Sequence, residues 1–235
     1  MVAKKRILLK LTGKVFLEPT QKTLDPQTIK TIATQIKQLQ QTHLFSIVIG
    51  GSNILKGDNQ GKTIGTTPSV GHQAGMLATM INGLMLKDLF EQEGISCSLL
   101  TSIFCPQIGL PASIENIDSA LKDDKIIIFS GGTGLPFFST DTNAIVRSLQ
   151  IGANQVWKAT NVDGIYTSDP QKNPDATLFK KIEYSDAICK KLGIIDTTAL
   201  TLAEKHGITV RVFNIFTPNA LIKSADNKDF GSTIT

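Results

Sequence analysis

The feature that most constrains this chain is a regular alternation of two apolar patterns. Short, uninterrupted apolar runs are typical of strands covered on both faces. They alternate with longer segments whose apolar residues recur at the spacing of amphipathic helices. The strand-like runs are Arg6–Leu11, Phe45–Ile49, Ser96–Thr101, Lys125–Phe129, Gln155–Ala159 and Thr209–Asn214. The alternation predicts an α/β fold with a mostly parallel central sheet and helices on both of its faces.

Signals at the ends of the other segments support this prediction. Asp25 followed by Pro26 is typical of a helix start, and Asp141 is interpreted as the cap of a later helix. One long helix is expected to carry a set of large apolar residues on one side. These are Met76, Leu77, Met80, Ile81, Leu84 and Met85. Gly231–Ile234 is expected to add an edge strand.

Four turns rich in glycine and hydroxyl groups follow strand-like runs. They are Thr12-Gly13, Gly50–Asn53, Gly131–Asp141 and Thr160–Gly164. Because parallel sheets bind ligands beyond the carboxyl ends of their strands, we expect these turns to meet at one edge of the sheet and to form the binding site.

The third of these turns, Gly131–Asp141, has a character of its own. It combines free backbone N–H groups with the positive end of a helix dipole, which favours an anion. It also holds Phe137 and Phe138, which are unusual in a solvent-exposed turn. The two rings either form a wall against a flat or apolar ligand or pack into the core beneath, and the local sequence leaves both alternatives open.

Composition narrows the class of protein and of ligand. A chain of 235 residues with 41% hydrophobic residues is long enough to bury a sizeable core. The net charge of +4 suits a small anionic ligand but is too low to indicate nucleic-acid binding. Cys97, Cys105 and Cys189 have no paired spacing, so neither a zinc site nor a disulfide framework is indicated. No apolar run approaches the roughly 20 residues that span a bilayer, and Met1–Arg6 leaves no room for a signal peptide, so we expect a soluble cytoplasmic protein.

Common nucleotide-binding and hydrolase motifs do not account for the four turns. Gly57–Thr63 resembles a P-loop, but three residues rather than four separate its glycines, and no strand directly precedes it. No G-x-G-x-x-G follows a strand, which disfavours a dinucleotide-binding Rossmann fold, and the chain contains no G-x-S-x-G.

Six motifs, taken together and in order, are more specific than any one of them. They are K-L-T-G at Lys10–Gly13, I-G-G-S-N at Ile49–Asn53, G-T-G-L-P-F-F-S-T-D at Gly132–Asp141, K-A-T-N-V-D-G-I-Y-T-S-D-P at Lys158–Pro170, I-I-D-T-T-A at Ile194–Ala199 and R-V-F-N at Arg211–Asn214. With G-M-L-A-T-M-I-N-G-L at Gly75–Leu84, they closely resemble the amino-acid kinase superfamily and, within it, the bacterial uridylate (UMP) kinase family. The resemblance runs nearly from end to end.

This resemblance implies a three-layer sandwich in which residues 1–235 form a single nucleoside monophosphate kinase domain. It also implies an enzyme of pyrimidine nucleotide biosynthesis that transfers the γ-phosphoryl group of ATP to UMP, giving ADP and UDP, with Mg²⁺. Because the family is typically hexameric, a homo-hexamer is expected. Neither a nucleic acid nor a membrane is an expected partner.

The resemblance also implies roles for single residues. The catalytic residues are Lys10, Asp141 and Asp196. The ATP-binding residues are Lys10, Leu11, Thr12, Gly13, Ser52, Lys56, Thr160, Tyr166 and Asp169. The UMP-binding residues are Gly51, His72, Thr133, Gly134, Leu135, Pro136, Phe137, Phe138, Ser139 and Thr140. No side chain is assigned as a metal ligand.

Elementary chemistry agrees with these roles. In-line phosphoryl transfer needs positioning and charge neutralisation, and a lysine just before a Thr-Gly turn, such as Lys10, supplies a point charge. The phosphate of UMP has a second pKa of about 6, so it is largely ionised at neutral pH and needs no general base. Asp141 and Asp196 are therefore better suited to orienting lysines or Mg²⁺ than to abstracting a proton.

Several positions depart from the family pattern. Lys14 stands where glutamate is common, Ser52 where a third glycine is usual, Lys56 where an arginine is usual and Leu135 where an asparagine is common. His72 stands where an aspartate is expected to bind the ribose of UMP. It either donates to a ribose hydroxyl or acts as a spacer.

Two alternatives to UMP phosphorylation stay open. One is phosphoryl transfer to a small carboxylate or carbamate, as in other members of the superfamily. The other is a nucleotide-sensing regulator that keeps the fold without catalysis, which His72 and Lys56 favour. The presence of Lys10, Asp141 and Asp196 argues against a loss of catalysis.

Overall fold

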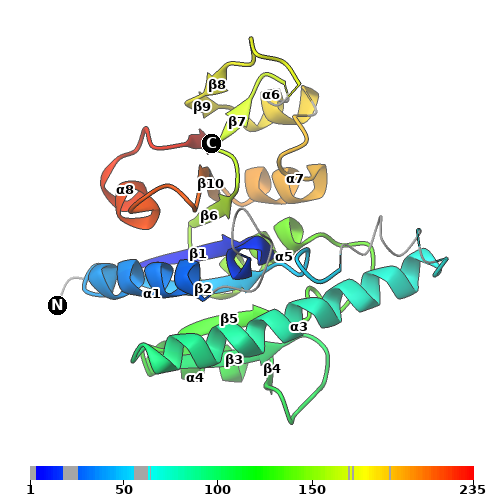
Figure 1. Ribbon diagram of the computed structural model, residues 1–235, viewed down its shortest axis with the longest axis vertical. Coiled ribbons are helices and arrows are strands. Elements are labelled where there is room, and N and C mark those ends of the chain that lie inside the picture. The colour runs from blue at the N-terminus through cyan, green and yellow to red at the C-terminus, as the bar shows by residue number, and fades with distance from the viewer. Residues whose placement is uncertain are drawn as a thin grey trace.

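The computed structural model describes residues 4–17, 26–55, 63, 65–168, 170, 172–190 and 192–235. Its central element is a nine-stranded sheet with the strand order β4-β3-β5-β2-β1-β6-β10-β11-β9 (Figure 1). The strands are β1 (Lys5–Leu11), β2 (His43–Ile49), β3 (Cys97–Thr101), β4 (Leu110–Pro111), β5 (Ile126–Ser130), β6 (Gln155–Thr160), β9 (Lys181–Ile182), β10 (Thr209–Asn214) and β11 (Ser232–Ile234). A separate antiparallel pair consists of β7 (Ile165–Tyr166) and β8 (Leu178–Phe179).

Helices cover both faces of the large sheet (Figure 1). One face carries α1 (Gln27–Leu39), α3 (Pro68–Gln92), α8 (Ala220–Asp226) and a short 3-10 helix, η1 (Gly13–Phe16). The other carries α4 (Ile114–Lys122), α5 (Thr140–Gln150), α6 (Tyr184–Cys189) and α7 (Thr197–Lys205). Among the described pairs of the large sheet, β10–β11 is antiparallel and the others are parallel. The predicted α/β fold with a mostly parallel sheet is confirmed.

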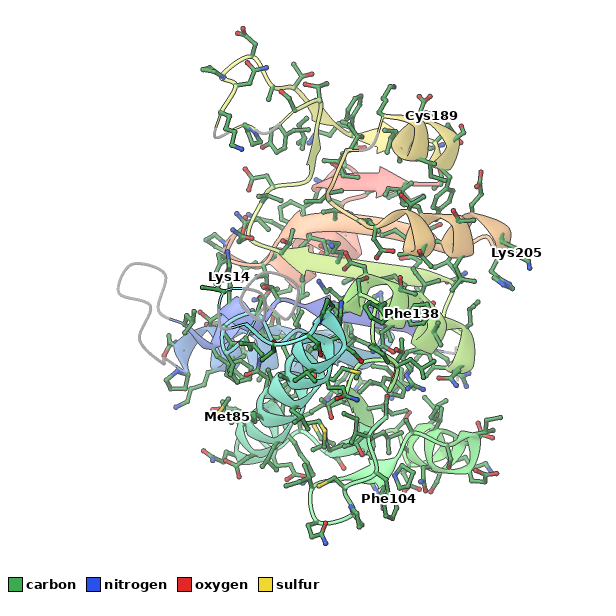
Figure 2. All side chains as sticks on the ribbon, turned by 90° about the vertical axis from the view of Figure 1, so that its right-hand side faces the viewer. Lys14, Met85, Phe104, Phe138, Cys189 and Lys205 are labelled. Atoms are coloured by element: carbon green, nitrogen blue, oxygen red, sulfur yellow. The ribbon has the colours of Figure 1, made fainter. Side chains whose placement is uncertain are left out.

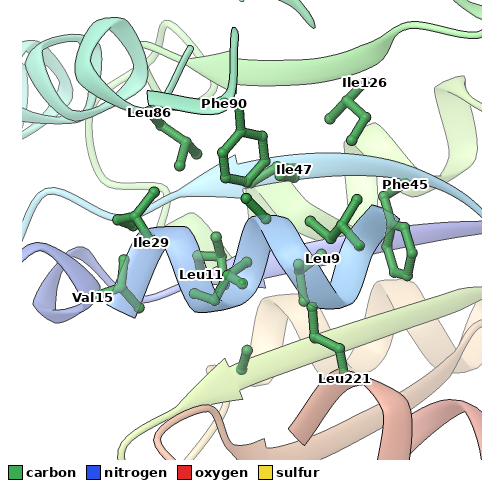
Figure 3. Packing of buried hydrophobic residues seen from close by; sticks show 14 of the residues in the cluster. Leu9, Leu11, Val15, Ile29, Phe45, Ile47, Leu86, Phe90, Ile126 and Leu221 are labelled. Carbon is green, nitrogen blue, oxygen red and sulfur yellow. The ribbon is translucent and has the colours of Figure 1, made fainter. Parts of the chain in front are cut away.

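The side-chain alternation of the strands divides the core into two layers. Leu9 and Leu11 of β1 lie in the layer formed with α1 and α3, where Phe90 also packs (Figure 3). Leu8, one position away, lies in the opposite layer with residues of α5 and α7. Because both faces are covered, β1 is apolar from Ile7 to Leu11 at every position except Lys10. Lys10 shares the face of Leu8 and is therefore directed toward α5.

The predicted edge strand at Gly231–Ile234 is wrong in its position. β11 pairs with β10 on one side and with β9 on the other, so it lies inside the sheet. The edge strand on this side of the sheet is β9, whose two residues, Lys181 and Ile182, are too few to produce a recognisable apolar pattern.

The apolar residues expected on one side of the long helix are in fact divided between two sides of α3. Met76 and Met80 are buried, whereas Leu77, Ile81 and Leu84 are 51%, 50% and 43% exposed. Adjacent residues of a helix are separated by about 100° of rotation, so the predicted set spans a wider arc than the sheet can cover. An exposed apolar strip therefore remains on α3.

Asp25, interpreted as a helix cap, lies outside the described residues, and α1 follows Pro26 directly. Within the described ranges, no helix is both long enough and apolar enough to span a bilayer.

Candidate active site

The carboxyl ends of four central strands lie at one edge of the sheet. β5, β2, β1 and β6 are consecutive neighbours and all run parallel. Hydrogen bonds join their ends, because the N–H of Gly50 donates to the carbonyl of Leu11 over 2.9 Å and the N–H of Thr12 donates to that of Ala159 over 3.3 Å. The predicted convergence of the four turns on one edge is confirmed.

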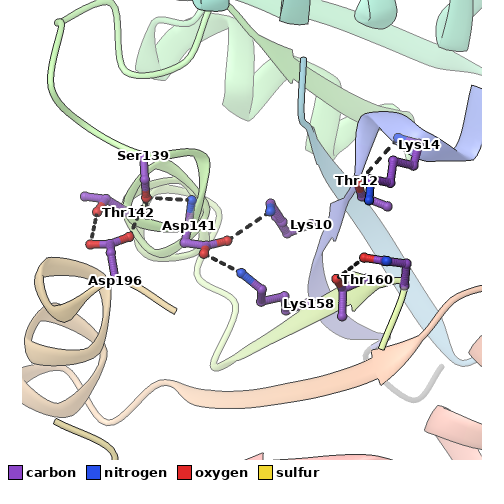
Figure 4. A network of polar contacts seen from close by, with 10 residues as sticks. Lys10, Thr12, Lys14, Ser139, Asp141, Thr142, Lys158, Thr160 and Asp196 are labelled. Carbon is purple, nitrogen blue, oxygen red and sulfur yellow. Dashed lines mark hydrogen bonds and ion pairs between the residues drawn. The ribbon is translucent and has the colours of Figure 1, made fainter. Parts of the chain in front are cut away.

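Two lysines lie side by side at this edge. Lys10 of β1 and Lys158 of β6 are directly opposite in the parallel register, and strand alternation directs both toward α5. Asp141, in the first turn of α5, lies between them (Figure 4). Its Oδ1 is 3.0 Å from Nζ of Lys10, and its Oδ2 accepts a hydrogen bond from Nζ of Lys158. One carboxylate thus holds two ammonium groups together.

The charges of the cluster shift the pKa values of Asp141 and Lys158. Burial raises the pKa of Asp141, but the charges of Lys10 and Lys158 outweigh burial and bring that pKa down to about 2. Burial, reinforced by the charge of Lys10, lowers the pKa of Lys158 to about 8, although Asp141 raises it. The cluster therefore carries one net positive charge at neutral pH and is suited to an anion.

A second carboxylate, Asp196, fixes the start of α5. Its Oδ1 accepts from the hydroxyl of Thr142 over 3.0 Å and from the N–H of Ala199 over 3.0 Å, and its Oδ2 accepts from the hydroxyl of Ser139 (Figure 4). Asp196 is therefore the N-cap of α7 and also links α7 to α5.

The interpretation of Asp141 as a helix cap is wrong. Ser139 is the N-cap of α5, and its Oγ accepts from the N–H groups of Asp141 and Thr142, each over 3.0 Å. Ser139 has the extended backbone of a cap, whereas Asp141 already lies within the helix. Two of the amides expected to bind an anion are consequently occupied by Ser139, and Asp141 is left to contact the lysines.

The turns after β1 and β2 approach each other closely. A Cβ at Gly13 would lie 2.2 Å from Oδ1 of Asn53 and 2.8 Å from the carbonyl oxygen of Gly50, so only glycine fits there. Asn53 and Asn82 exchange side-chain hydrogen bonds of 3.1 and 2.7 Å, which hold this turn against α3. Backbone rather than side chains therefore lines this part of the site.

The loop from Gly131 to Ser139 is held at both ends and exposed between them. The N–H of Gly131 donates to Oγ1 of Thr79 over 2.8 Å, and Ser139 is held by Asp196. Leu135, Phe137 and Phe138 are 59%, 65% and 47% exposed. Figure 2 shows Phe138 midway along the molecule, between Cys189 and Phe104. The two rings are therefore not packed into the core, and their contact with a ligand stays a prediction.

Phe137 has a strained backbone and a ring partner. Its φ of 70° lies in the left-handed region, which is costly for a residue with a Cβ. Its ring lies 4.8 Å from that of His72 between centroids, so α3 brings His72 to the tip of the loop. The prediction that His72 belongs to the same region as the loop is supported by this contact, while its role stays a prediction.

The remaining predicted residues are distributed around the edge. Thr12 directly follows β1, Thr160 ends the neighbouring β6, and Ser52 is exposed beside Gly51. Tyr166 lines a cavity of about 390 Å³ whose other walls include Lys190, Leu192 and Ile194, which the sequence did not single out. Lys56 and Asp169 lie outside the described residues, as does all of the P-loop-like segment except Thr63.

The described residues contain no ready-made metal cage. No group of three or more His, Cys, Asp or Glu side chains among them could hold a metal ion. Mg²⁺ is commonly held by one or two carboxylates together with the phosphates of a substrate. Asp141, ionised and at the edge, fits that smaller requirement.

A larger cavity, of about 700 Å³, lies at the opposite edge of the sheet. Lys4, Lys5, Arg6 and Asp124 are among its lining residues. Lys4 pairs with Asp124 over 2.9 Å, and Arg6 donates to the carbonyl of Ile151 over 2.9 Å. Because Lys4, Arg6 and Asp124 already have partners, the carboxyl edge remains the better candidate.

The chain matches a known protein family along most of its length. The model of the amino acid kinase family matches residues 5–214 of the chain. The chain belongs to this family. The matched region contains every strand that contributes to the lysine–aspartate cluster.

Individual members of the amino acid kinase family are similar to the chain over its whole length. Uridylate kinase of Pseudoalteromonas atlantica is 39% identical over 233 residues, which cover 99% of this chain and 94% of the relative. The crystal structure of UMP kinase from Ureaplasma parvum superposes with a TM-score of 0.93 at 32% identity and covers 99% of both chains. UMP kinase from Bacillus anthracis superposes with a TM-score of 0.92 at 29% identity, covering 98% of this chain and 96% of the other.

Proposed function

We propose that this protein is a UMP kinase, which transfers the γ-phosphoryl group of ATP to UMP and gives ADP and UDP for pyrimidine nucleotide biosynthesis. The observation that carries the proposal is the cluster of Lys10, Lys158 and Asp141 at the carboxyl edge of the sheet. Phosphoryl transfer needs positive charge at the transferring group rather than covalent chemistry. The full-length similarity to uridylate kinases supplies the substrate.

The two nucleotides are assigned to the two sides of the cluster. The turn Thr12–Gly13 and Ser52 take the phosphates of ATP, Gly51 faces UMP, and the cavity beside Tyr166 takes the nucleoside of ATP. The loop 133–140 takes UMP. Lys10 and Lys158 would then neutralise the transferring phosphoryl group, with Asp141 holding both ammonium groups in place.

Asp196 acts indirectly in this scheme. It fixes Ser139 and Thr142 and thereby the junction between the loop and α5. Mg²⁺, when bound, supplies further charge neutralisation on the phosphates, and Asp141 is the carboxylate that would face it. The whole chain, residues 1–235, is proposed to act as one cytoplasmic domain.

A single assay tests the proposal against its two alternatives. Purified protein is incubated with MgATP and, separately, UMP, CMP, dTMP, glutamate, aspartate or carbamate. We expect UDP formation with UMP. ADP release with a carboxylate or carbamate alone would support another kinase of the family. Tight UMP binding without ADP release would support a regulator. Either of these two results contradicts the proposal.

The pKa of Lys158 predicts an alkaline limit to activity. The free protein is expected to lose kcat/KM for ATP as the pH rises through about 8, since deprotonated Lys158 no longer attracts phosphate. Lys158→Arg should move this limb to higher pH, because a guanidinium stays protonated. Initial rates between pH 6 and 10 measure both limbs. A limb that is unchanged in Lys158→Arg would assign the titration to another group.

The exposed strip on α3 predicts association of the chain. Leu77, Ile81 and Leu84 expose apolar surface that a monomer would leave in water. We propose that this strip lies in an interface of a homo-hexamer. Sedimentation velocity should show a hexamer for the wild type and smaller species for Leu77→Glu with Ile81→Glu. Leu149→Glu on α5 is the matched control and should leave the hexamer intact. A monomeric wild type would contradict the proposal.

A further inference from the structure

Arg147 is a buried cation that the proposed chemistry does not use. It lies in the last turn of α5 and is 6% exposed. Among the described residues, no carboxylate lies within ion-pair distance of it. Its guanidinium lies 5.0 Å from the centroid of the Phe129 ring, and its Nη1 contacts Oε1 of Gln150. A buried arginine without an acidic partner is costly, so its contacts require an explanation.

The other terminal nitrogen of the guanidinium is connected by hydrogen bonds to the loop that is assigned to UMP. Nη2 of Arg147 donates to Oγ of Ser102 over 2.7 Å. The same Oγ donates to the carbonyl of Gly132 over 2.6 Å. A continuous chain of hydrogen bonds thus joins α5, the segment after β3 and the base of the loop. A serine that accepts from a cation is polarised and donates more strongly.

The loop also rests directly on the backbone of Ser102. A Cβ at Gly131 would lie 3.1 Å from the N of Ser102, and a Cβ at Gly134 would lie 3.0 Å from its carbonyl oxygen. Both glycines have positive φ, of 76° and 81°. Ser102 is therefore the surface on which the first half of the loop is built, and Arg147 fixes the orientation of its hydroxyl.

We infer that Arg147 is a positioning residue for the acceptor loop. It acts through Ser102 on Gly132 and sets the conformation in which the loop binds the acceptor nucleotide. The inference rests on the proposed function for the identity of that nucleotide. It predicts that loss of the Arg147–Ser102 contact weakens binding of the acceptor and leaves binding of ATP nearly unchanged, because the ATP turns belong to β1 and β2.

Two variants test this directly. Ser102→Ala removes the hydroxyl, and Arg147→Met removes the guanidinium while keeping much of its apolar volume. We expect each to raise KM for UMP about 10-fold, the effect of losing one charge-assisted hydrogen bond. KM for ATP should change less than about twofold. The double variant should resemble Ser102→Ala alone, because the two residues act in series.

Arg211→Met is the matched control. Arg211 is also buried, at 7% exposure, and lies over Trp157, but it donates to carbonyls of Asn227 and Phe230, away from the loop. Its loss should lower the melting temperature without changing the ratio of the two KM values. Equal changes in both KM values in Ser102→Ala would reduce Arg147 to a structural role and overturn the inference.

Hydrogen exchange of the unliganded protein provides a readout that does not depend on turnover. The peptide containing residues 131–139 should exchange faster in Ser102→Ala and in Arg147→Met than in the wild type, while peptides of β1 and β2 should not change. If UMP proves not to be the acceptor, this result still decides the inference about the loop. Unchanged exchange in both variants would overturn it.

Discussion

Replacing Lys10 by methionine is expected to lower kcat roughly 1,000-fold, the size of effect seen when one preorganised donor to a transition state is removed. The ammonium of Lys10 is held 3.0 Å from Oδ1 of Asp141 and faces the edge where the phosphates would meet. Methionine keeps the length of the side chain but carries no charge. The dissociation constant for UMP, measured by calorimetry, should change less than about threefold, because the loop 133–140 is unaltered.

Lys14→Met is the matched control for this prediction. Lys14 lies four positions further along, has an exposed side chain, and contacts Thr12 through its backbone N–H (Figure 4). Its replacement should leave kcat close to that of the wild type. A loss of less than about tenfold in Lys10→Met would show that Lys10 does not contact the transferring group.

Replacing Asp141 by asparagine is expected to lower the free energy of unfolding by roughly 3 kcal/mol, because it leaves two buried ammonium groups beside each other without a counter-charge. The side chains of Lys10 and Lys158 are 13% and 8% exposed, so water can compensate little of the loss. Urea denaturation at pH 7 measures the effect. Asp118→Asn on the exposed side of α4 is the control and should change stability by less than about 0.5 kcal/mol.

The pH dependence of this variant follows from linkage. In the wild type the folded-state pKa of Lys158 is about 8, below its ordinary value of 10.5. Without Asp141, which raises it, that pKa falls further. Between the folded and the ordinary value the unfolded chain binds more protons, so stability rises with pH. The variant begins this rise at lower pH than the wild type, and the difference between them should narrow as the pH approaches about 8.

A second substitution distinguishes charge from packing. Adding Lys158→Met to Asp141→Asn removes one of the two unpaired cations, and most of the lost stability should return. Turnover should stay low, since the double variant lacks two groups of the cluster. If stability does not recover, the defect of Asp141→Asn lies in the packing of α5 rather than in the lysines.

Local sequence patterns were sufficient to predict the central strands and the convergence of their turns at one edge of the sheet. β1 is apolar at every position from Ile7 to Leu11 except Lys10, because α1 covers one of its faces and α5 the other. The turn chemistry of Thr12-Gly13 and Gly50–Asn53 follows from the close approach of those backbones. The role of Lys158 was missed. Its importance depends on the register that places it opposite Lys10, and that register joins two strands distant in sequence.

The contacts of the Asp141 and Asp196 carboxylates could not be predicted from the local sequence. Aspartate is a residue type that often caps helices, but at the start of α5 the free N–H groups donate to Ser139 instead. Asp196 looks like an isolated acidic residue before T-T-A, yet it caps α7 and holds Ser139 at once. Such contacts are made by side chains from different helices, and only the packing of α5 against α7 determines which of them meet.

The position of β1 at the middle of the sheet has a consequence for synthesis on the ribosome. β1 is the first strand to be made, and one of its two neighbours, β6, is made much later, with Ile7 paired to Gln155. The N–H of Leu221 likewise donates to Gln35 of α1 over 2.9 Å. A nascent chain can pair β1 with β2, and β2 with β5, before β6 is made, but the half of the site on β6 must wait for most of the polypeptide. High contact order of this kind slows folding and prolongs exposure of an unpaired central strand.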